Sequence, residues 1–387
     1  MPGFEAIGQE ELHQIAEVFE VGGGILFRHG FEKLRGNSYK VREFENAFAN
    51  QFGVQDSLAV SSGTAALRVA LASLGIGHGD EVVTQSFTFV ATVEAIVESG
   101  ATPVITEIDE TLNMDPQDLR RKITEKTKAI IPVHMLGTPA AMEEILSIAE
   151  EFSIPVIEDT AWGCGGKYRD RFLGTLGDVG CFSFDFAKTI TTGEGGMVIA
   201  KQPAILEKAM AWHDHGHENN PSVPRWEDTR SSSGFNFRMS ELQGAVGIAQ
   251  LRKLDGIVTR QREVHASLST ELKRVRGLEI RKVPDGSSPS CDALVFQAPS
   301  TAAAKAVRKV LLEESLGSTK ILPEAISWHF AGSWNHIDSL IRRNGALHRA
   351  FPRSLEILQK SVALPISIKD KFEAHSKIAE AIAKVLN

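Results

Sequence analysis

Two kinds of hydrophobic pattern alternate between residues 57 and 200. Short apolar runs are typical of buried strands, whereas apolar positions three and four residues apart are typical of helices. The predicted strands are 57–62, 81–85, 102–108, 128–134, 154–159, 179–184 and 195–200. The predicted helices between them are 64–75, 90–100 and 139–152. Strands separated by helices of this length are expected to pair mainly in parallel.

A different pattern begins after the predicted sheet. Ser240 precedes Gln243 by three residues, which is a helix start signal, and an apolar stripe follows. Farther along come two predicted strands at 277–283 and 293–299 and a predicted helix at 377–387. We therefore predict an α/β fold with two domains. Residues 1–255 form a large domain with an N-terminal helical segment and a mainly parallel sheet, and residues 256–387 form a smaller α+β domain.

Composition narrows the class of protein. The chain has 387 residues, 42% of them hydrophobic, and a net charge of −7, which argues against a nucleic-acid partner. Its three cysteines are widely spaced, as expected in a reducing compartment. No apolar run is long enough to cross a bilayer, and the acidic N-terminus does not resemble a signal peptide. These features predict a cytoplasmic protein without a membrane partner.

Lys188 is the first candidate for chemistry. It follows the predicted strand 179–184 and precedes the glycine-rich residues 193–196. An ammonium group in apolar surroundings loses its proton more easily, and the free amine can then form a Schiff base with an aldehyde. The alternative is an ordinary surface lysine on an amphipathic turn.

Asp159 ends the predicted strand 154–159, and ligands bind to parallel sheets at the carboxyl ends of the strands. A carboxylate at this edge could keep the ring nitrogen of a pyridine-type cofactor protonated. Its alternative role is that of a helix-capping or turn residue.

Other segments predict an anion site and an aromatic wall. Ser62, Gly63 and Thr64 lie where a predicted strand turns into a helix, so free backbone N–H groups and the helix dipole would favour an anion. Ser183 could add a hydroxyl group. Phe87 or Phe89 could cover a flat ring, although phenylalanines usually lie in the core.

Taken in order, these segments resemble the DegT/StrS-type sugar aminotransferases, which use pyridoxal 5'-phosphate. The resemblance is carried by residues 61–67, 79–96, 154–159, 182–198 and 234–251. It implies an aspartate-aminotransferase-like fold of the pyridoxal-phosphate transferases (fold type I). It also implies a homodimer with two shared active sites.

The resemblance assigns a role to each matching residue. Lys188 matches the Schiff-base lysine, and Asp159 matches the partner of the pyridine nitrogen. Further matches are Ser62, Gly63, Thr64 and Ser183 near the phosphate, Phe89 over the ring, Asn236 reaching the phosphate of the neighbouring subunit, and Arg238 in the same motif. Trp162 replaces the usual histidine or glutamine near the ring, and Asp185 replaces the usual histidine or asparagine. Because relatives that dehydrate carry histidine at the lysine position, Lys188 predicts transamination.

A narrower likeness suggests a substrate. Residues 1–5, 27–45, 184–191, 213–218 and 327–337 are similar to those of the enzymes that make 8-amino-3,8-dideoxy-octulosonate, a sugar acid of lipopolysaccharide, with glutamate as amino donor. Both substrates of such an enzyme carry a carboxylate, and Arg28 and Arg35 could bind these groups. The alternative role of both arginines is solvated surface charge. This likeness predicts amination of 8-oxo-3-deoxy-octulosonate.

Three histidines alternate at His213, His215 and His217, so on a strand they would share one face. No further ligand spacing completes a metal site, and we predict none. We expect His215 or His217 to contact substrate, and His329 is a further candidate. Two functional alternatives stay open. One is an aminotransferase for nucleotide-linked keto sugars, and the other is a non-catalytic protein that binds the cofactor or a sugar as a regulator.

Overall fold

The large sheet is assembled from two sets of hydrogen-bonded strands. The computed structural model describes residues 2–220, 222–314, 320–321 and 328–386. One set has the order β1-β9-β8-β5 and the other β3-β2-β4, and bridges from Ile130 to Val156 and from Val133 to Asp159 join the two. The strands are β1 (Ser57–Val60), β2 (Glu81–Gln85), β3 (Thr102–Thr106), β4 (Thr127–Ile131), β5 (Ile157–Asp159), β8 (Val179–Ser183) and β9 (Gly196–Ala200).

Most of these strands are parallel, as predicted. β2 pairs in parallel with β3 and β4, and β5 pairs in parallel with β8. β9 differs, because it runs antiparallel to both β1 and β8. The chain returns from β8 to β9 without a crossover helix, and a parallel connection would need one. Residues 195–200 are thus the exception in a sheet that is mainly parallel, as predicted.

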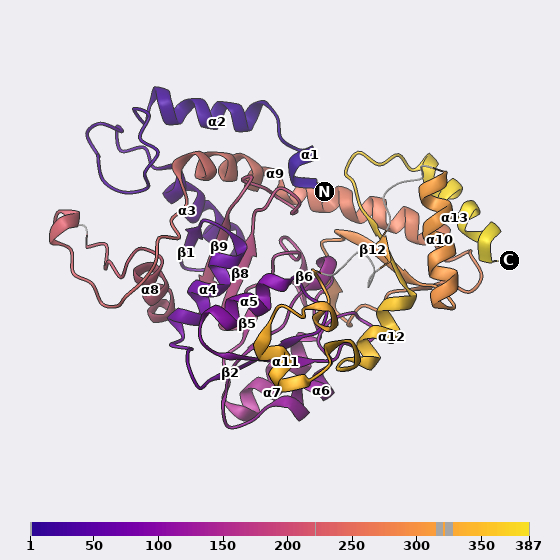
Figure 1. The fold of residues 1–387 in the computed structure, drawn as a ribbon. Coiled ribbons are helices and arrows are strands. Elements are labelled where there is room, and N and C mark those ends of the chain that lie inside the picture. Colours follow the sequence, from indigo (N-terminus) through magenta and orange to yellow (C-terminus); the bar gives the residue numbers. More distant parts are fainter. Residues whose placement is uncertain (1, 221, 315–319, 322–327, 387) are drawn as a thin grey trace.

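Helices cover both faces of the sheet (Figure 1). Leu58 and Val60 of β1 pack with α4, α5 and α8, whereas Ala59 between them packs with α3 and α9. Farther along the sheet, α6 and α7 cover the second face. The helices are α3 (Lys40–Phe52), α4 (Gly63–Ser73), α5 (Val90–Glu98), α6 (Pro116–Lys122), α7 (Met142–Phe152), α8 (Pro203–Trp212) and α9 (Glu241–Leu272). Side chains that alternate between the two faces of each strand thus pack against helices on both sides, so the sheet lies between two layers of helices.

The N-terminal segment is helical, with α1 (Pro2–Glu5) and α2 (Gln9–Glu20). α2 lies along α9 (Figure 1). The Lys253 ammonium group of α9 pairs with the Glu11 carboxylate of α2 at 2.8 Å, and Glu11 is buried. This contact fixes the N-terminal segment on the outer surface of α9.

The C-terminal part has its own antiparallel sheet, in the order β10-β12-β14-β13. Its elements are β10 (Glu279–Ile280), β12 (Ala293–Gln297), α10 (Thr301–Glu313), β13 (Lys320–Ile321), α11 (Asp338–Asn344), α12 (Pro352–Lys360), β14 (Ser361–Pro365) and α13 (Glu373–Leu386). α10 and α13 pack on this sheet through an apolar cluster of their own. A small sheet of β6 (Lys167–Tyr168), β7 (Arg171–Phe172) and β11 (Ser287–Ser288) connects this part to the large domain.

The predicted domain boundary, Asp255, lies inside α9. The first half of this helix packs with α3 and the last half packs with the C-terminal sheet, so one continuous helix serves both parts (Figure 1). The division at residue 255 stays a prediction. Within the described residues, no helix is both long and apolar enough to cross a membrane.

Candidate active site

A cavity of about 430 Å³ opens at the carboxyl ends of the parallel strands. The segments that follow β1, β2, β5 and β8 all contribute to its wall, as the edge rule for parallel sheets predicts. The predicted site residues that line it are Ser62, Gly63, Thr64, Phe89, Asp159, Trp162, Ser183, Lys188 and His329. Nine residues chosen from separate segments of the sequence therefore meet at one place.

Lys188 lies in the turn after β8 and is half-buried. Its ammonium nitrogen lies 3.6 Å from the centroid of the Trp162 ring. Loss of hydration lowers the pKa of Lys188, and the nearby carboxylates of Asp292, Asp185 and Asp159 oppose this change. The amine is thus more easily deprotonated than that of an ordinary lysine, which a nucleophile requires.

Asp159 lies at the end of β5 and is 4% exposed. One carboxylate oxygen, Oδ1, accepts the backbone N–H of Ala161 at 3.1 Å, and the other, Oδ2, accepts the Thr92 hydroxyl at 2.8 Å. Burial raises the pKa of Asp159, although these two donors and the charge of Lys188 act in the opposite direction. A cationic partner inside the cavity would favour the ionised carboxylate.

The start of α4 forms the opposite end of the cavity. Ser62 caps this helix, because its hydroxyl oxygen accepts the backbone N–H of Ala65 at 3.0 Å. A side chain at Gly63 would lie 2.7 Å from the Ser183 side chain, so only glycine allows strand β8 to approach the helix this closely. The exposed Thr64 and the Ser183 hydroxyl add polar groups to a helix N-terminus that already favours an anion.

Aromatic rings form the rest of the wall. The rings of Phe89 and His329 lie 5.4 Å apart, and those of Trp162 and His329 lie 6.2 Å apart. The Trp162 indole N–H is buried and has no hydrogen-bond partner among the residues that the structure describes. A flat ligand with a polar substituent would fill the space between these rings and could satisfy that donor.

The donor set fits pyridoxal 5'-phosphate. Asp159 would hold the ring nitrogen, and Lys188 would hold the aldehyde carbon. The N-terminus of α4, with Ser62, Gly63, Thr64 and Ser183, would hold the phosphate. The cavity thus combines a buried carboxylate, a half-buried amine, aromatic walls and an anion site, which are the groups that this cofactor needs.

Arg28 and Arg35 lie outside the cavity, and both have internal partners. Arg28 pairs with the Glu45 carboxylate at 2.8 Å and also contacts His213 at 3.3 Å. Arg35 is 1% exposed and pairs with Glu241 at 3.4 Å. Each guanidinium group therefore fixes the N-terminal segment to the large domain. The role in carboxylate binding that the narrower likeness suggested stays a prediction.

The histidine segment is a turn, not a strand. His217 is buried and pairs with Asp228 at 3.0 Å, whereas His215 is exposed, with a positive φ of 56°. Neither residue lines the cavity. The three histidines do not share a strand face, because His215 and the adjacent Gly216 both have left-handed backbone conformations. Among the described residues, no cluster of three or more metal-binding side chains exists.

Asn236 and Arg238 also lie outside this cavity. Asn236 is exposed and is bridged to Asp214 through the backbone. The Arg238 guanidinium group donates to the Asp214 carboxylate, which also pairs with His29 at 3.0 Å and Arg225 at 2.6 Å. Burial alone would raise the pKa of Asp214, but His29 and Arg225 hold it well below its usual value. Arg238 thus holds its loop in place, and Asn236 presents its side chain to solvent.

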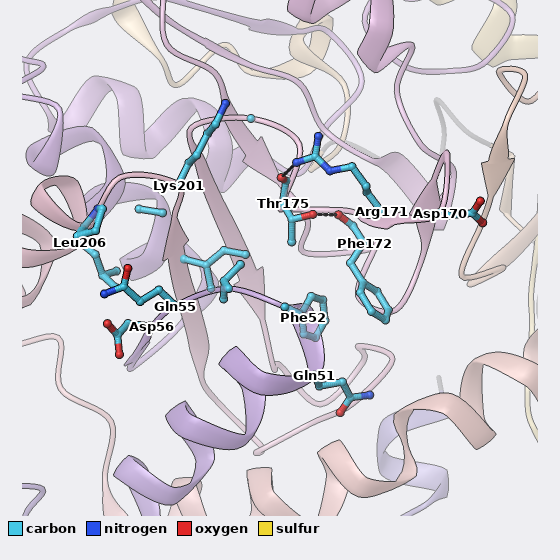
Figure 2. A pocket seen from close by; sticks show the side chains of 17 residues that line it. Gln51, Phe52, Gln55, Asp56, Asp170, Arg171, Phe172, Thr175, Lys201 and Leu206 are labelled. Carbon is cyan, nitrogen blue, oxygen red and sulfur yellow. Dashed lines mark hydrogen bonds between the residues drawn. The ribbon is translucent and has the colours of Figure 1, made fainter.

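A second cavity, of about 530 Å³, lies next to the N-terminal end of β1 (Figure 2). Phe52, Asp56, Arg171 and Lys201 are among the residues that line it, and none of the predicted site residues does. Its charged side chains are of both signs. The chemistry predicted for this chain therefore belongs to the first cavity.

Sequence reasoning missed several residues of the first cavity. Thr88 and Thr92 form a hydroxyl chain to Asp159, and Trp328 stands beside Phe89 with a ring separation of 6.1 Å. The spacing of four residues between the threonines, at the start of a predicted helix, was an available signal. Trp328 is adjacent to His329, which was singled out alone.

Comparison with known proteins agrees with this geometry. A model of the DegT/DnrJ/EryC1/StrS aminotransferase family matches residues 31–383. GDP-perosamine synthase of Escherichia coli O157:H7 is 42% identical over 225 residues, and the match spans 58% of this chain and 60% of that protein. Spore coat polysaccharide biosynthesis protein SpsC of Bacillus subtilis (strain 168) is 31% identical over 394 residues, which cover 98% of this chain and 95% of that protein.

Solved structures show the same fold. A 3-amino-5-hydroxybenzoic acid synthase superposes with a TM-score of 0.84 at 27% identity, covering 100% of this chain and 98% of that one. An aminotransferase from Psychrobacter cryohalolentis superposes with a TM-score of 0.85 at 25% identity, covering 98% and 97% of the two chains. The predicted fold type I is confirmed, and so is an enzyme that uses pyridoxal 5'-phosphate. The chain belongs to the DegT/DnrJ/EryC1/StrS aminotransferase family.

Proposed function

We propose that this chain transfers an amino group from L-glutamate to a keto sugar that is linked to a nucleotide. Three relatives named GDP-perosamine synthase support this substrate class, at 42%, 41% and 36% identity. Each match covers 66% or less of the relative. The relative in B. subtilis is named for polysaccharide biosynthesis, which supports a sugar substrate as well.

The observation that carries the reaction class is the common cavity of Lys188 and Asp159. Pyridoxal 5'-phosphate, when bound, would supply an aldehyde and a ring that stabilises negative charge at the carbon next to the amine. Asp159 would keep the ring nitrogen protonated, because a buried carboxylate strongly prefers a cationic neighbour.

Lys188 would act as the general base and acid. With its pKa lowered by burial, its Nζ atom accepts the proton that the donor's α carbon loses. The same atom later delivers a proton to the sugar carbon that gains the amine. Because the donor leaves before the sugar enters, ping-pong kinetics are expected.

The positions of two arginines favour the nucleotide-linked substrate over the free octulosonate. That sugar acid would need a cation for its carboxylate, and Arg28 and Arg35 were the candidates. Both pair with carboxylates of this chain, Glu45 and Glu241, at 2.8 and 3.4 Å. The comparisons likewise support the nucleotide-linked alternative. The family assignment makes the chain an enzyme rather than a non-catalytic regulator.

The proposed active unit is a homodimer in which Asn236 reaches the phosphate of the neighbouring subunit. Its exposed side chain supports this role, because it lies on a loop that Arg238 and Asp214 fix in place. In the same unit, exposed His215 would approach the substrate, whereas buried His217 would only support the loop.

The test compares two amino acceptors on the same enzyme. With L-glutamate as donor, a GDP-linked keto sugar should yield 2-oxoglutarate at a kcat/KM far above that of 8-oxo-3-deoxy-octulosonate. Lys188→Ala serves as the control and should release no 2-oxoglutarate with either sugar. Preference for the octulosonate would contradict the proposed substrate. If the enzyme aminated neither sugar but still converted glutamate to 2-oxoglutarate in the first half-reaction, the proposed reaction class would stand and both sugars would be rejected.

A further inference from the structure

Two threonine hydroxyls form a buried chain that ends at Asp159. The Thr88 and Thr92 hydroxyl oxygens lie 2.7 Å apart, and Thr92 Oγ1 lies 2.8 Å from Asp159 Oδ2. Thr88 is 0% exposed, Thr92 1% and Asp159 4%. Water therefore does not compete for these hydrogen bonds. Thr92 is the one side chain within the described residues that donates a hydrogen bond to this carboxylate.

The protonation state of Asp159 decides in which direction the hydrogen bonds of this hydroxyl chain run. An ionised carboxylate only accepts, so the Thr92 hydroxyl must donate to it, and the single proton of Thr88 is then free to donate to Thr92 at 2.7 Å. If the carboxyl carried a proton on Oδ2, that oxygen would donate to Thr92 and the direction of the hydrogen bonds would reverse. Thr88 could then donate only to the Phe89 carbonyl oxygen, at the longer distance of 3.4 Å. The hydroxyl chain consequently favours the ionised form of Asp159.

Thr88, at the outer end of the hydroxyl chain, is held in place by the C-terminal part of the protein. The backbone N–H of Thr88 donates to the His329 carbonyl oxygen at 3.0 Å, and that of Val90 donates to the Trp328 carbonyl oxygen at 2.8 Å. A backbone bridge also joins Phe87 to Phe330. These bonds hold the start of α5, where the spacing of four residues puts Thr88 one turn before Thr92 and lets their hydroxyls meet at 2.7 Å.

We propose that Thr92 is a positioning residue that keeps Asp159 ionised and oriented for the ring nitrogen of the cofactor, with Thr88 as the second link. Thr92 does not contact the cofactor in this role and acts only through the carboxylate. The proposal depends on pyridoxal 5'-phosphate as cofactor and is independent of the sugar. Its failure would leave the proposed substrate untouched.

The experiment compares the natural cofactor with an analogue whose ring nitrogen is replaced by carbon. The full chain is freed of cofactor, and the dissociation constants of both compounds are measured from the quenching of tryptophan fluorescence. In Thr92→Val a methyl group replaces the hydroxyl at nearly constant volume. Because a hydrogen bond to a charged group is lost, the cofactor should bind about tenfold more weakly. The analogue, which has no charged ring nitrogen, should bind as it does to the unchanged chain.

Two further variants keep the test decisive. Thr92→Ser retains the hydroxyl and should restore the affinity for the natural cofactor. Thr88→Val removes the outer link and should cause a smaller loss with the same selectivity, so it carries the test if Thr92→Val does not fold. Equal weakening of cofactor and analogue would indicate a purely structural role and overturn the proposal. Unchanged affinity for both would overturn it as well.

Discussion

The ammonium nitrogen of Lys188 lies over the indole ring of Trp162, 3.6 Å from its centroid. The face of an aromatic ring attracts a cation, so this contact favours the charged form of the lysine. Burial acts in the opposite direction and lowers the pKa of Lys188. Trp162 thus limits how easily the amine loses its proton. This contact gives Trp162 a physical role in the cavity.

Replacing Trp162 tests this balance. Trp162→Leu removes the ring and should lower the pKa of Lys188 further, whereas Trp162→Phe keeps an aromatic face and should change it less. The measurement is reductive methylation of the cofactor-free chain at a series of pH values, followed by peptide mass mapping at position 188. The modification profile of Trp162→Leu should move to lower pH. A profile that moves to higher pH would show that the ring does not stabilise the ammonium group.

Lys188 should also reduce the stability of the cofactor-free chain. Its pKa is lower in the folded than in the unfolded state, so the unfolded chain binds the proton more tightly at neutral pH. Lys188→Met keeps the shape without the charge and should raise the unfolding midpoint at pH 7. The difference should shrink as the pH rises toward the ordinary pKa of lysine. A lower midpoint for the variant would mean that Trp162 and the neighbouring carboxylates more than offset the burial.

Acid stability should depend on His213. Burial lowers its pKa to about 3. Its ring fits the neutral form, because Nδ1 donates to the Met210 carbonyl oxygen at 2.5 Å and Nε2 accepts from Arg28 at 3.3 Å. Since the unfolded chain takes up the proton near pH 6.5, the fold loses stability from there down to about pH 3, by up to about 1.4 kcal/mol per pH unit.

Denaturant titrations between pH 7 and pH 4 test this dependence. His213→Asn should make the fall in unfolding free energy shallower over that range. His348→Asn, at an exposed position, should leave the slope unchanged. Equal slopes for His213→Asn and the unchanged chain would show that other groups determine the acid sensitivity.

Arg35 separates a structural role from a substrate role. It is buried, pairs with Glu241 and lies 4.0 Å from the centroid of the Tyr39 ring. Arg35→Gln leaves a buried carboxylate unpaired and should cost about 3–5 kcal/mol of unfolding free energy. Exposed Arg276→Gln should cost nothing measurable. If Arg35→Gln instead kept its stability and raised the KM of the sugar, the substrate role predicted from the sequence would return.

The sequence predicted the cavity well where local pattern and sheet topology agree. Asp159 ends a buried strand and Ser62 starts a helix, and the edge rule alone brings both to one side of a parallel sheet. Gly63 is a further example. The segments that contain Gly63 and Ser183 end at the same edge of the sheet, which brings the two residues close together. Such residues can be predicted without knowledge of distant contacts.

Residues whose partners are distant in sequence could not be predicted in this way. The pairing of Arg28 with Glu45 depends on how the N-terminal segment folds back, and the pairing of Arg35 with Glu241 depends on α9. The alternating histidines would share one face only on a strand, and the positive φ of His215 and Gly216 turns the backbone there instead. The direction of β9 was missed because the pattern predicts a strand but not its orientation.

The covalent reactivity of Lys188 is the most direct test of the whole account. The enzyme carrying its cofactor is reduced with borohydride, digested and mapped by mass spectrometry. The account predicts a pyridoxyl phosphate adduct on the peptide that contains Lys188, and none in Lys188→Ala. An unmodified Lys188 peptide from cofactor-loaded enzyme, or an adduct on another lysine, would contradict it.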